Sequence, residues 1–585
     1  MRNAKIVCTL GPATNSRSAI RDLSEAGMAV ARLNASHGSL EDRAELIDRV
    51  RRVDEATPNP VAVMLDTKGP EIRTAPLPGG ETVTLETGSE IRFVEGTNAS
   101  AEEVGLSVPL TSVEPGDHIL LDDGLIETTV TGVDGEAVLA RVETGGELGG
   151  RKGVNLPGVA LDLDVVTEKD RRDLELAAEK DVDFVAASFV RNADDVYEVS
   201  EALESFGAEI PIISKIERAG AVDNLDEIIE ASYGIMVARG DLGVECPMED
   251  VPMIQKRIIR KAREAGRPVI TATEMLDSMV HSRRPTRAEA SDVANAVLDG
   301  TDAVMLSAET AVGDHPTAVV EAMDSIIRQV ERSGEYAELL EQRVPTAGEA
   351  RTDALARSAR YLARDIGADA VVAATESGYT ALKTAKYRPG VPVVASTPSH
   401  RVRRQLALTW GVTPLYASVS DQGADAVVSR AVQSALDAGV AESGDTVVVL
   451  CGMMTELEGA NTTNMMKVHV AADALETGRV VVDGRATGPI ARVTDGDLAA
   501  IPDGAIIALS ADFDAEFTGD VGKIGGIVDA RPGMTGYPAL IARETGVPMV
   551  SDADVTHLQD GRTVTIDGER GVVYDGDVRG RSTRN

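Results

Sequence analysis

Short runs of apolar, mostly β-branched residues recur through the first 310 residues of the chain. With one long interruption, each run is followed by a stretch of alternating charged and apolar residues. The apolar runs are continuous, which is typical of parallel strands covered on both faces. Eight such units predict a closed (β/α)8 TIM barrel with an outer ring of helices, and an open doubly wound sheet is the alternative. The runs begin at Lys5, Ala29, Val61, Val182, Pro211, Gly234, Pro268 and Asp302.

The long interruption separates the third and fourth runs. Apolar and polar residues alternate there with a period of two, in residues 81–93 and again in residues 118–132. This alternation is the pattern of half-buried strands, and it predicts an inserted β-rich, barrel-like domain at residues 70–154. Glycines at both junctions, among them Gly69, can serve as hinges, so we expect the inserted domain to act as a lid.

Two further units follow the barrel. We expect a long helix near residues 316–343, a linker around Pro345, and then an open α/β sheet with four strands. The last part of the chain is rich in glycine and valine. The predicted domains are therefore a barrel of residues 1–69 and 155–345, a lid of residues 70–154, an α/β domain of residues 346–475, and an extra C-terminal domain of residues 476–585.

The charge of the chain limits the classes of molecule that it can bind. Acidic residues number 95 against 58 basic ones, the net charge is −37, and only 12 of the bases are lysine. This balance argues against nucleic acid as a partner, and no apolar stretch is long enough to predict a membrane span. An acidic, lysine-poor chain with 3% aromatic residues indicates adaptation to molar salt, where charges are screened over roughly 3 Å. An ordinary acidic protein is the alternative.

Cysteine usage and the first residues of the chain indicate the cellular compartment of the protein. Cys8, Cys246 and Cys451 are far apart and none belongs to a CxxC pair, which argues against a disulfide framework and a zinc site. The first residues run directly into an apolar strand and leave no room for an export signal. We therefore expect a cytoplasmic protein.

Polar residues follow most of the predicted barrel strands. The carboxyl ends of parallel barrel strands meet on one face, so we expect these residues to form an active site there. No phosphate-binding GxxxxGK loop occurs in the chain. The strand-end segments are 32–38, 66–68, 215–217, 239–241, 271–274 and 307–310.

Three of these strand-end residues suggest a chemistry. Glu217 and Asp241 follow adjacent strands, and their oxygens suit a magnesium ion that shares its other positions with water and a phosphorylated substrate. Lys215 lies near the barrel mouth, where partial burial requires a counter-charge, and Glu217 faces the same way. A purely structural ion pair is the alternative. The turn at Gly240 can present backbone N–H groups to an anion.

Seven sequence motifs carry a resemblance to a known family. They are ARLNASHG at 31–38, LDTKGPEIRT at 65–74, RKGVNLPG at 151–158, ISKIE at 213–217, MVARGDLGVE at 236–245, RPTRAEASDVANAVLDG at 284–300 and MLSAETAVGDHP at 305–316. In order and spacing they resemble the pyruvate kinase family over residues 1–475. The resemblance implies a homotetramer that transfers the phosphoryl group of phosphoenolpyruvate to ADP, giving ATP and pyruvate, with Mg²⁺ or Mn²⁺ and K⁺ as cofactors.

The resemblance also implies roles for individual residues. Lys215 would stabilise negative charge in the transition state and on the departing enolate. Glu71 matches the potassium-dependent branch of the family. In potassium-independent members, a lysine at this position replaces the ion's charge. For the reaction itself, the resemblance implies Arg32, Lys215 and Thr273 as catalytic residues and the N–H groups of Gly240 and Asp241 as ligands of the substrate carboxylate. For the metals, it implies Glu217 and Asp241 for Mg²⁺, and Asn34, Ser36, Asp66 and Thr67 for K⁺. For the nucleotide, it implies Asn34, His37, Arg73 and Lys152.

A loop in the α/β domain resembles the family's effector site. Thr375, Ser377, Gly378 and Thr380 follow a predicted strand, and their hydroxyl and N–H groups can hold a phosphate. The effector would be a sugar phosphate or AMP. A hydroxyl-capped helix start is the alternative.

Residues 476–585 resemble the swivelling phosphohistidine domain of phosphoenolpyruvate-utilising enzymes. Where that domain carries its histidine, in a TSHA motif, this chain reads Thr535-Gly536-Tyr537-Pro538. The acceptor imidazole is missing, so we predict a structural or regulatory domain without phosphotransfer.

Two other functions stay open. One is a sensor that binds sugar phosphate and has lost turnover, against which the presence of Lys215, Glu217 and Asp241 argues. The other is a lyase or mutase of enolate chemistry, because magnesium and a lysine also stabilise an enolate. The inserted domain and the nucleotide-contact residues favour the kinase.

Overall fold

The computed structural model describes residues 2–77, 81–159, 163–418, 423–452, 463–472 and 474–578. The eight apolar runs form parallel strands that close into a barrel in the order β1-β17-β16-β15-β14-β13-β3-β2. The barrel prediction is confirmed and the open-sheet alternative is wrong. The strands are β1 (Lys5–Thr9), β2 (Val30–Asn34), β3 (Ala62–Asp66), β13 (Phe184–Ala187), β14 (Ile212–Ile216), β15 (Gly234–Ala238), β16 (Val269–Ala272) and β17 (Ala303–Leu306).

Alternate residues of the barrel strands face two different cores. In β1, Val7 belongs to the core inside the barrel, whereas Ile6 and Cys8 belong to the core between the strands and the outer helices. Both sets are buried, which explains why the strands are continuously apolar.

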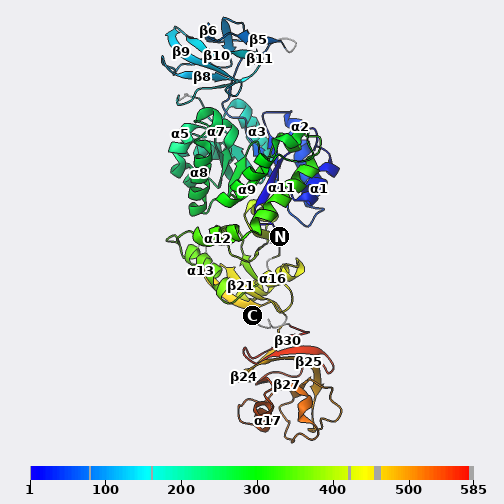
Figure 1. Ribbon diagram of the computed structural model, residues 1–585. Helices are drawn as coiled ribbons and strands as arrows, with labels where there is room; N and C mark the ends of the chain where they lie inside the picture. Colours follow the sequence, from blue (N-terminus) through cyan, green and yellow to red (C-terminus); the bar gives the residue numbers. More distant parts are fainter. Residues whose placement is uncertain are drawn as a thin grey trace.

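Helices cover the outside of the barrel (Figure 1). Three of them start at Ser39, Thr167 and Thr286, each in a reciprocal capping box with an acid three residues later. The barrel helices are α1 (Arg17–Ala26), α2 (Leu40–Asp54), α3 (Glu168–Glu179), α4 (Ala193–Ser205), α5 (Ala219–Asp223), α6 (Leu225–Ala231), α7 (Arg239–Glu245), α8 (Val251–Ala265), η2 (Asp277–Val280), α9 (Arg287–Asp299), α10 (Ala308–Ala311) and α11 (Pro316–Glu331).

The long helix expected near residues 316–343 is in fact two helices. α11 ends at Glu331 and α12 (Gly334–Gln342) begins two residues after Arg332. The side chain of Ser333 accepts a hydrogen bond from the Tyr336 N–H, so this serine caps a new helix rather than continuing the old one.

The inserted domain is a β structure with its own core, which includes Phe93, Val104 and Val138. Seven strands form one sheet in the order β4-β12-β8-β9-β10-β6-β7, and β11 pairs with β5. The domain lies on the opposite side of the barrel from the α/β domain (Figure 1). Its strands are β4 (Ile72–Arg73), β5 (Thr82–Leu85), β6 (Glu90–Glu95), β7 (Glu103–Leu106), β8 (His118–Leu121), β9 (Ile126–Asp134), β10 (Ala137–Thr144), β11 (Gly146–Gly149) and β12 (Gly153–Asn155).

The α/β domain contains a sheet in the order β20-β19-β18-β21-β22. The four predicted strands are present, and β22 is an additional antiparallel edge strand. The elements are α13 (Arg351–Asp365), β18 (Ala370–Ala374), α14 (Tyr379–Lys386), β19 (Val393–Thr397), α15 (His400–Gln405), η3 (Leu406–Leu408), β20 (Val412–Tyr416), α16 (Gly423–Asp437), β21 (Thr446–Cys451) and β22 (Met465–Val470).

The inserted domain, the barrel, the α/β domain and the C-terminal domain, here called the tail, form an elongated row (Figure 1). Val470 of β22 packs with Tyr574 and Val578, which joins the tail to the α/β domain. Its elements are β23 (Ala474–Thr477), β24 (Arg479–Val482), β25 (Arg485–Arg492), β26 (Ala505–Leu509), η4 (Val521–Lys523), β27 (Ile524–Asp529), α17 (Tyr537–Thr545), β28 (Met549–Ser551), β29 (Thr563–Asp567) and β30 (Val572–Asp575).

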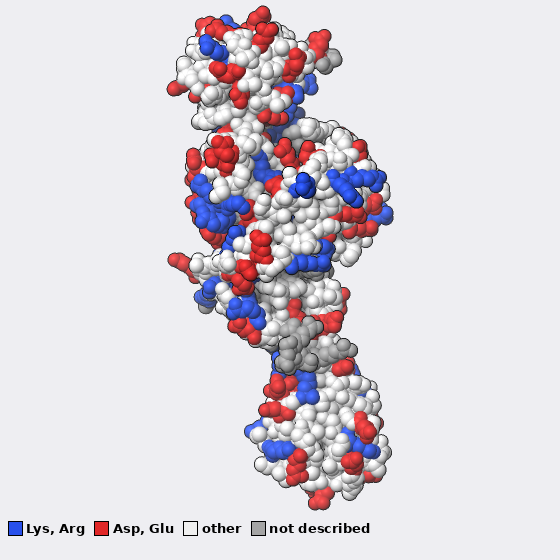
Figure 2. Space-filling model, in the orientation of Figure 1, with Lys and Arg blue, Asp and Glu red and all other residues white. Residues whose placement is uncertain are grey.

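Charged side chains of both signs are spread over the face shown in Figure 2. Within the described ranges, no helix has the length and apolar character needed to cross a membrane.

Candidate active site

Lys215, near the carboxyl end of β14, is the centre of a buried polar cluster. Its Nζ donates to Ser188 Oγ at 2.8 Å and lies 2.8 Å from Glu217 Oε1 and 3.2 Å from Asp66 Oδ1. Burial opposes the charge of the ammonium, but the carboxylates of Asp66 and Glu217 outweigh it and raise the pKa of Lys215. The lysine therefore stays protonated at the barrel mouth.

Arg32, at β2, brings a second cation to the same cluster. Its Nε donates to Asp66 Oδ2 at 2.6 Å and its Nη1 to Thr9 Oγ1 at 2.9 Å. Burial opposes ionisation of Asp66, but the charges of Arg32 and Lys215 hold its pKa below the ordinary value. One buried carboxylate thus fixes the orientation of both cations.

Glu217 and Asp241 form the acidic side of the cluster. Burial raises the pKa of Glu217 to about 7; the charge of Lys215 opposes this shift and that of Asp241 adds to it. Burial also raises the pKa of Asp241, opposed by Lys215 and increased by Asp123 of the inserted domain. Glu217 is buried and Asp241 is half-buried. Two neighbouring carboxylates that repel each other are suited to a divalent cation, and their oxygens match Mg²⁺ or Mn²⁺.

A cation at these carboxylates would have few protein ligands. In the part of the chain that the structure describes, no group of three or more His, Cys, Asp or Glu side chains is arranged to hold a metal. Mg²⁺ usually keeps several positions for water and substrate, so two carboxylates are enough protein ligands for it.

Thr273 and Glu274 follow β16 with left-handed backbone conformations, at φ values of 67° and 52°. Arg239, at the start of α7, holds this turn by donating to Thr273 O at 2.7 Å and to Ala272 O at 3.1 Å. The Thr273 hydroxyl donates to Ala272 O at 2.7 Å and accepts from Gly240 N at 2.8 Å. The N–H of Gly240, which was expected to face a substrate carboxylate, is thus bonded to Thr273.

The oxygens expected to bind K⁺ lie at the ends of two neighbouring strands. Asn34 of β2 is opposite Asp66 of β3 in the sheet register. The Ser36 N–H donates to Asn34 Oδ1 at 3.0 Å, and Thr67 O accepts from Ser188 Oγ at 2.6 Å. These residues therefore lie beside Arg32 and Lys215.

Ser188 belongs to the cluster, although the sequence analysis did not select it. It directly follows β13 and is 2% exposed. The next residue, Phe189, has a φ of 57°, and its N–H donates to Glu217 Oε2 at 2.6 Å. The strand-end rule that selected the other residues would have identified Ser188 had it been applied to the fourth strand.

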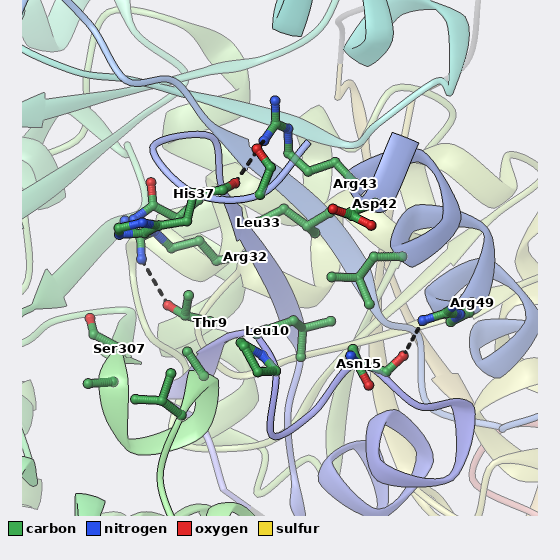
Figure 3. Close-up of a pocket in the computed structure, with 18 of the residues that line it drawn as sticks. Thr9, Leu10, Asn15, Arg32, Leu33, His37, Asp42, Arg43, Arg49 and Ser307 are labelled. Atoms are coloured by element: carbon green, nitrogen blue, oxygen red, sulfur yellow. Dashed lines mark hydrogen bonds between the residues drawn. The ribbon is translucent and has the colours of Figure 1, made fainter. Parts of the chain in front are cut away.

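A cavity of about 750 Å³ opens beside this cluster (Figure 3). Arg32, Asn34 and His37 line it, together with Thr9 and Ser307 from the ends of β1 and β17. Two of the residues expected to contact a nucleotide, Asn34 and His37, are therefore in this cavity.

The other two residues expected to contact a nucleotide lie on the inserted domain. Arg73 Nη2 lies 2.8 Å from Glu71 Oε1, and Lys152 Nζ lies 2.9 Å from Asp122 Oδ1. Neither Arg73 nor Lys152 lines the cavity. Their contribution to nucleotide binding stays a prediction.

Comparison with known proteins agrees with this geometry. The family model described as pyruvate kinase, barrel domain, matches residues 1–320, and the pyruvate kinase alpha/beta domain matches residues 353–469. A pyruvate kinase of Geobacillus stearothermophilus is 42% identical over 588 residues, covering 98% of this chain and 99% of the relative. One of Staphylococcus aureus strain MRSA252 is 42% identical over 585 residues with the same coverage.

The chain belongs to the pyruvate kinase family. The resemblance inferred from its motifs is confirmed. The tail matches a third model, the mobile domain of PEP-utilising enzymes, over residues 501–571.

The expected effector loop connects β18 to α14. Gly378 precedes α14 with a φ of 86° and, as a glycine, offers no side chain to cap the helix. The hydroxyl of Thr380 is buried 2.8 Å from Thr463 Oγ1, and the Thr375 N–H donates to Ser396 O. Ser377 is exposed. A role in phosphate binding stays a prediction.

In the tail, the segment that replaces the histidine motif starts α17. The Tyr537 hydroxyl accepts a hydrogen bond from the Phe517 N–H at 3.2 Å, and the two rings lie 5.6 Å apart. Tyr537 therefore has a packing role here. The imidazole of His557 is 81% exposed and lies outside this segment.

Proposed function

We propose that the chain is an active pyruvate kinase of glycolysis that transfers the phosphoryl group of phosphoenolpyruvate to ADP. The observation that carries this proposal is the cluster of Lys215, Arg32 and Asp66 beside the buried carboxylate of Glu217, at the mouth of the barrel. Two cations and two acids in a largely dry site match a reaction that depends on positioning and charge stabilisation.

Each of the two cations has a role in this reaction. The bond between the enol oxygen and phosphorus breaks, and a terminal phosphate oxygen of ADP forms the new bond to phosphorus. Arg32 and Lys215 hold the transferring group, and Lys215 also stabilises the enolate oxygen that departs. Asp66 keeps both side chains aimed at that group through its contacts with Arg32 and Lys215.

Thr273 is assigned to the protonation that completes the reaction. The enolate must gain a proton at carbon to become pyruvate, and the Thr273 hydroxyl is already aligned by Gly240 N and Ala272 O. Substrate binding would release the N–H groups of Gly240 and Asp241 toward the substrate carboxylate at the start of α7.

We assign Mg²⁺ or Mn²⁺ to Glu217 and Asp241, because their carboxylates repel each other and offer only oxygen ligands. Bound there, the ion supplies positive charge next to the phosphoryl and enolate oxygens. Asn34, Ser36, Asp66 and Thr67 are assigned to K⁺, since they offer oxygens from two adjacent strand ends.

The nucleotide is assigned to the cavity lined by Asn34 and His37. Arg73 and Lys152 join it when the inserted domain closes, with Gly69, at a φ of 68°, near the hinge. The loop of Thr375, Ser377, Gly378 and Thr380 is assigned to the phosphate of a sugar-phosphate or AMP effector. A cytoplasmic homotetramer is part of the same proposal, and the tail is assigned a structural or regulatory role.

An assay of pyruvate formation from phosphoenolpyruvate, with ADP present and then omitted, tests the proposal. We expect pyruvate only when ADP is present. Pyruvate formed at the same rate without ADP would indicate a lyase, and no pyruvate under either condition would indicate a sensor.

A further inference from the structure

A second, much smaller cavity lies between the barrel and the α/β domain. Its volume is about 20 Å³. Four cationic side chains and a single carboxylate line it, in a chain whose net charge is −37. The charged lining residues are Arg263, Arg267 and Asp302 from the barrel, and Lys386 and Arg388 from the α/β domain.

Several polar atoms of this lining are buried without a partner. Nε and Nη2 of Arg263, Nη1 of Arg388 and Oγ1 of Thr409 make no hydrogen bond to any residue that the structure describes. Arg263 is 8% exposed, Arg388 1% and Thr409 3%. Buried charged donors are rarely left unsatisfied, because each loses its contacts with water and gains nothing in return. The cavity therefore needs an acceptor.

One nitrogen of each guanidinium group lies near Gly300, at the boundary between the barrel and the α/β domain. A Cβ placed on Gly300 would lie 3.5 Å from Arg263 Nη1 and also 3.5 Å from Arg388 Nη1. Burial lowers the pKa of Arg263 to about 9, and the charge of Arg388 adds to that effect. Two buried like charges near the same glycine are stabilised by a negative charge placed close to both.

The nearby acids do not supply enough of that charge. Asp302 already accepts from the Val269 N–H at 2.9 Å and from Arg388 Nη2 at 3.3 Å. Lys386 Nζ is paired with Asp353 at 2.8 Å, away from Arg263. One carboxylate is thus shared among Arg388, Arg263 and the backbone, and the cavity retains an excess of positive charge.

We infer that this cavity binds one small monovalent anion, of which chloride is the natural example. Nε and Nη2 of Arg263, Nη1 of Arg388 and the Thr409 hydroxyl would donate to it. The volume admits one ion or water and excludes a phosphate ester. Water would satisfy the donors but not the charge. The anion links the barrel to the α/β domain, so it stabilises the folded chain by binding only when the two are docked.

Crystals of the full chain soaked in sodium bromide test the site directly, because bromide replaces chloride and scatters anomalously. We expect an anomalous peak between Arg263 and Arg388. A crystal that shows bromide peaks elsewhere but none in this cavity would overturn the inference, and an ordered water there would explain the cavity instead.

Thermal unfolding provides an independent test in solution. Chloride is varied against gluconate at constant potassium concentration and ionic strength, and the melting temperature Tm of the full chain should rise by several degrees with chloride. Arg263→Met should abolish this rise, whereas Arg260→Met, on the exposed side of the same helix, should retain it. Thr409→Val keeps both arginines and should raise the chloride concentration needed by ~fivefold. A folded Arg263→Met variant with an unchanged chloride response would refute the site.

Discussion

The Oγ of Ser188 lies 2.8 Å from Lys215 Nζ and 2.6 Å from Thr67 O, so one buried hydroxyl connects the central lysine to the end of β3. Ser188→Ala should remove the hydrogen bond that orients the ammonium. We expect kcat to fall by about tenfold to a hundredfold, with a smaller change in the KM for phosphoenolpyruvate, because the lysine is misdirected rather than lost.

Steady-state kinetics on Ser188→Ala and on Ser358→Ala, a control in the exposed part of α13, would check this prediction. The control should have normal kinetics. A Ser188→Ala enzyme whose KM rises while kcat is unchanged would show that the hydroxyl contributes to binding only.

Lys215→Met removes the central positive charge of the site. We expect turnover to fall by about a thousandfold or more, since the lysine stabilises charge that develops in the transition state. Stability should fall by about 3–5 kcal/mol as well, because Asp66 and Glu217 lose a buried partner. Lys180→Met, which removes a partly exposed lysine paired with Asp48, should have normal turnover. If the turnover of the Lys215→Met variant fell by less than tenfold, the assigned role of Lys215 in charge stabilisation would be excluded.

The activity should depend on potassium. In potassium-free buffer of matched ionic strength made with tetramethylammonium chloride, we expect turnover at least about tenfold lower than in potassium chloride. Glu71→Lys should reduce this dependence, because the lysine replaces the charge of the ion. Equal rates of the unmodified enzyme in both buffers would reject the prediction.

Dilution of salt should unfold the protein. At a net charge of −37, weaker screening lets the acidic residues repel one another over about 10 Å at 0.1 M and over longer distances below it. The single tryptophan, Trp410, is 2% exposed and reports on the barrel's contact with the α/β domain. We expect its fluorescence to shift to the red in millimolar buffer and to recover when potassium chloride is restored. Full activity in millimolar buffer would favour the alternative interpretation, that this is an ordinary acidic protein without adaptation to molar salt.

The tail should not accept a phosphoryl group. After incubation with phosphoenolpyruvate labelled at phosphorus, we expect no acid-labile label in residues 476–585, because the segment around Tyr537 has no imidazole and His557 lies elsewhere. Mass spectrometry of the tail peptides under neutral conditions would check this. A phosphorylated histidine in the tail would contradict it.

Much of the fold could be predicted because barrel strands bury both faces. Val7 on one side and Ile6 on the other both need apolar neighbours, and the same requirement recurs in every barrel strand. The edge strand β22 was not predicted, because Lys467 and His469 interrupt its apolar pattern. The break between α11 and α12 depends on one capping serine within an otherwise helical sequence.

The site was predictable to the extent that it follows strand ends. Lys215 and Glu217 are close in sequence and Asp66 ends another strand, so the barrel geometry alone brings them together. Which oxygen bonds to which nitrogen is decided by side-chain packing, as in the contact of Gly240 N with Thr273. The approach of Arg263 to Arg388 arises only when two domains dock, and no local pattern in the sequence indicates it.

Thr273 is a branched residue held in a backbone conformation that glycine adopts far more readily. Replacing it with glycine would relax the turn but would also remove the hydroxyl and its hydrogen bonds to Gly240 N and Ala272 O. The strained backbone of this turn is present before any substrate arrives, so the position of Thr273 is set when the chain folds.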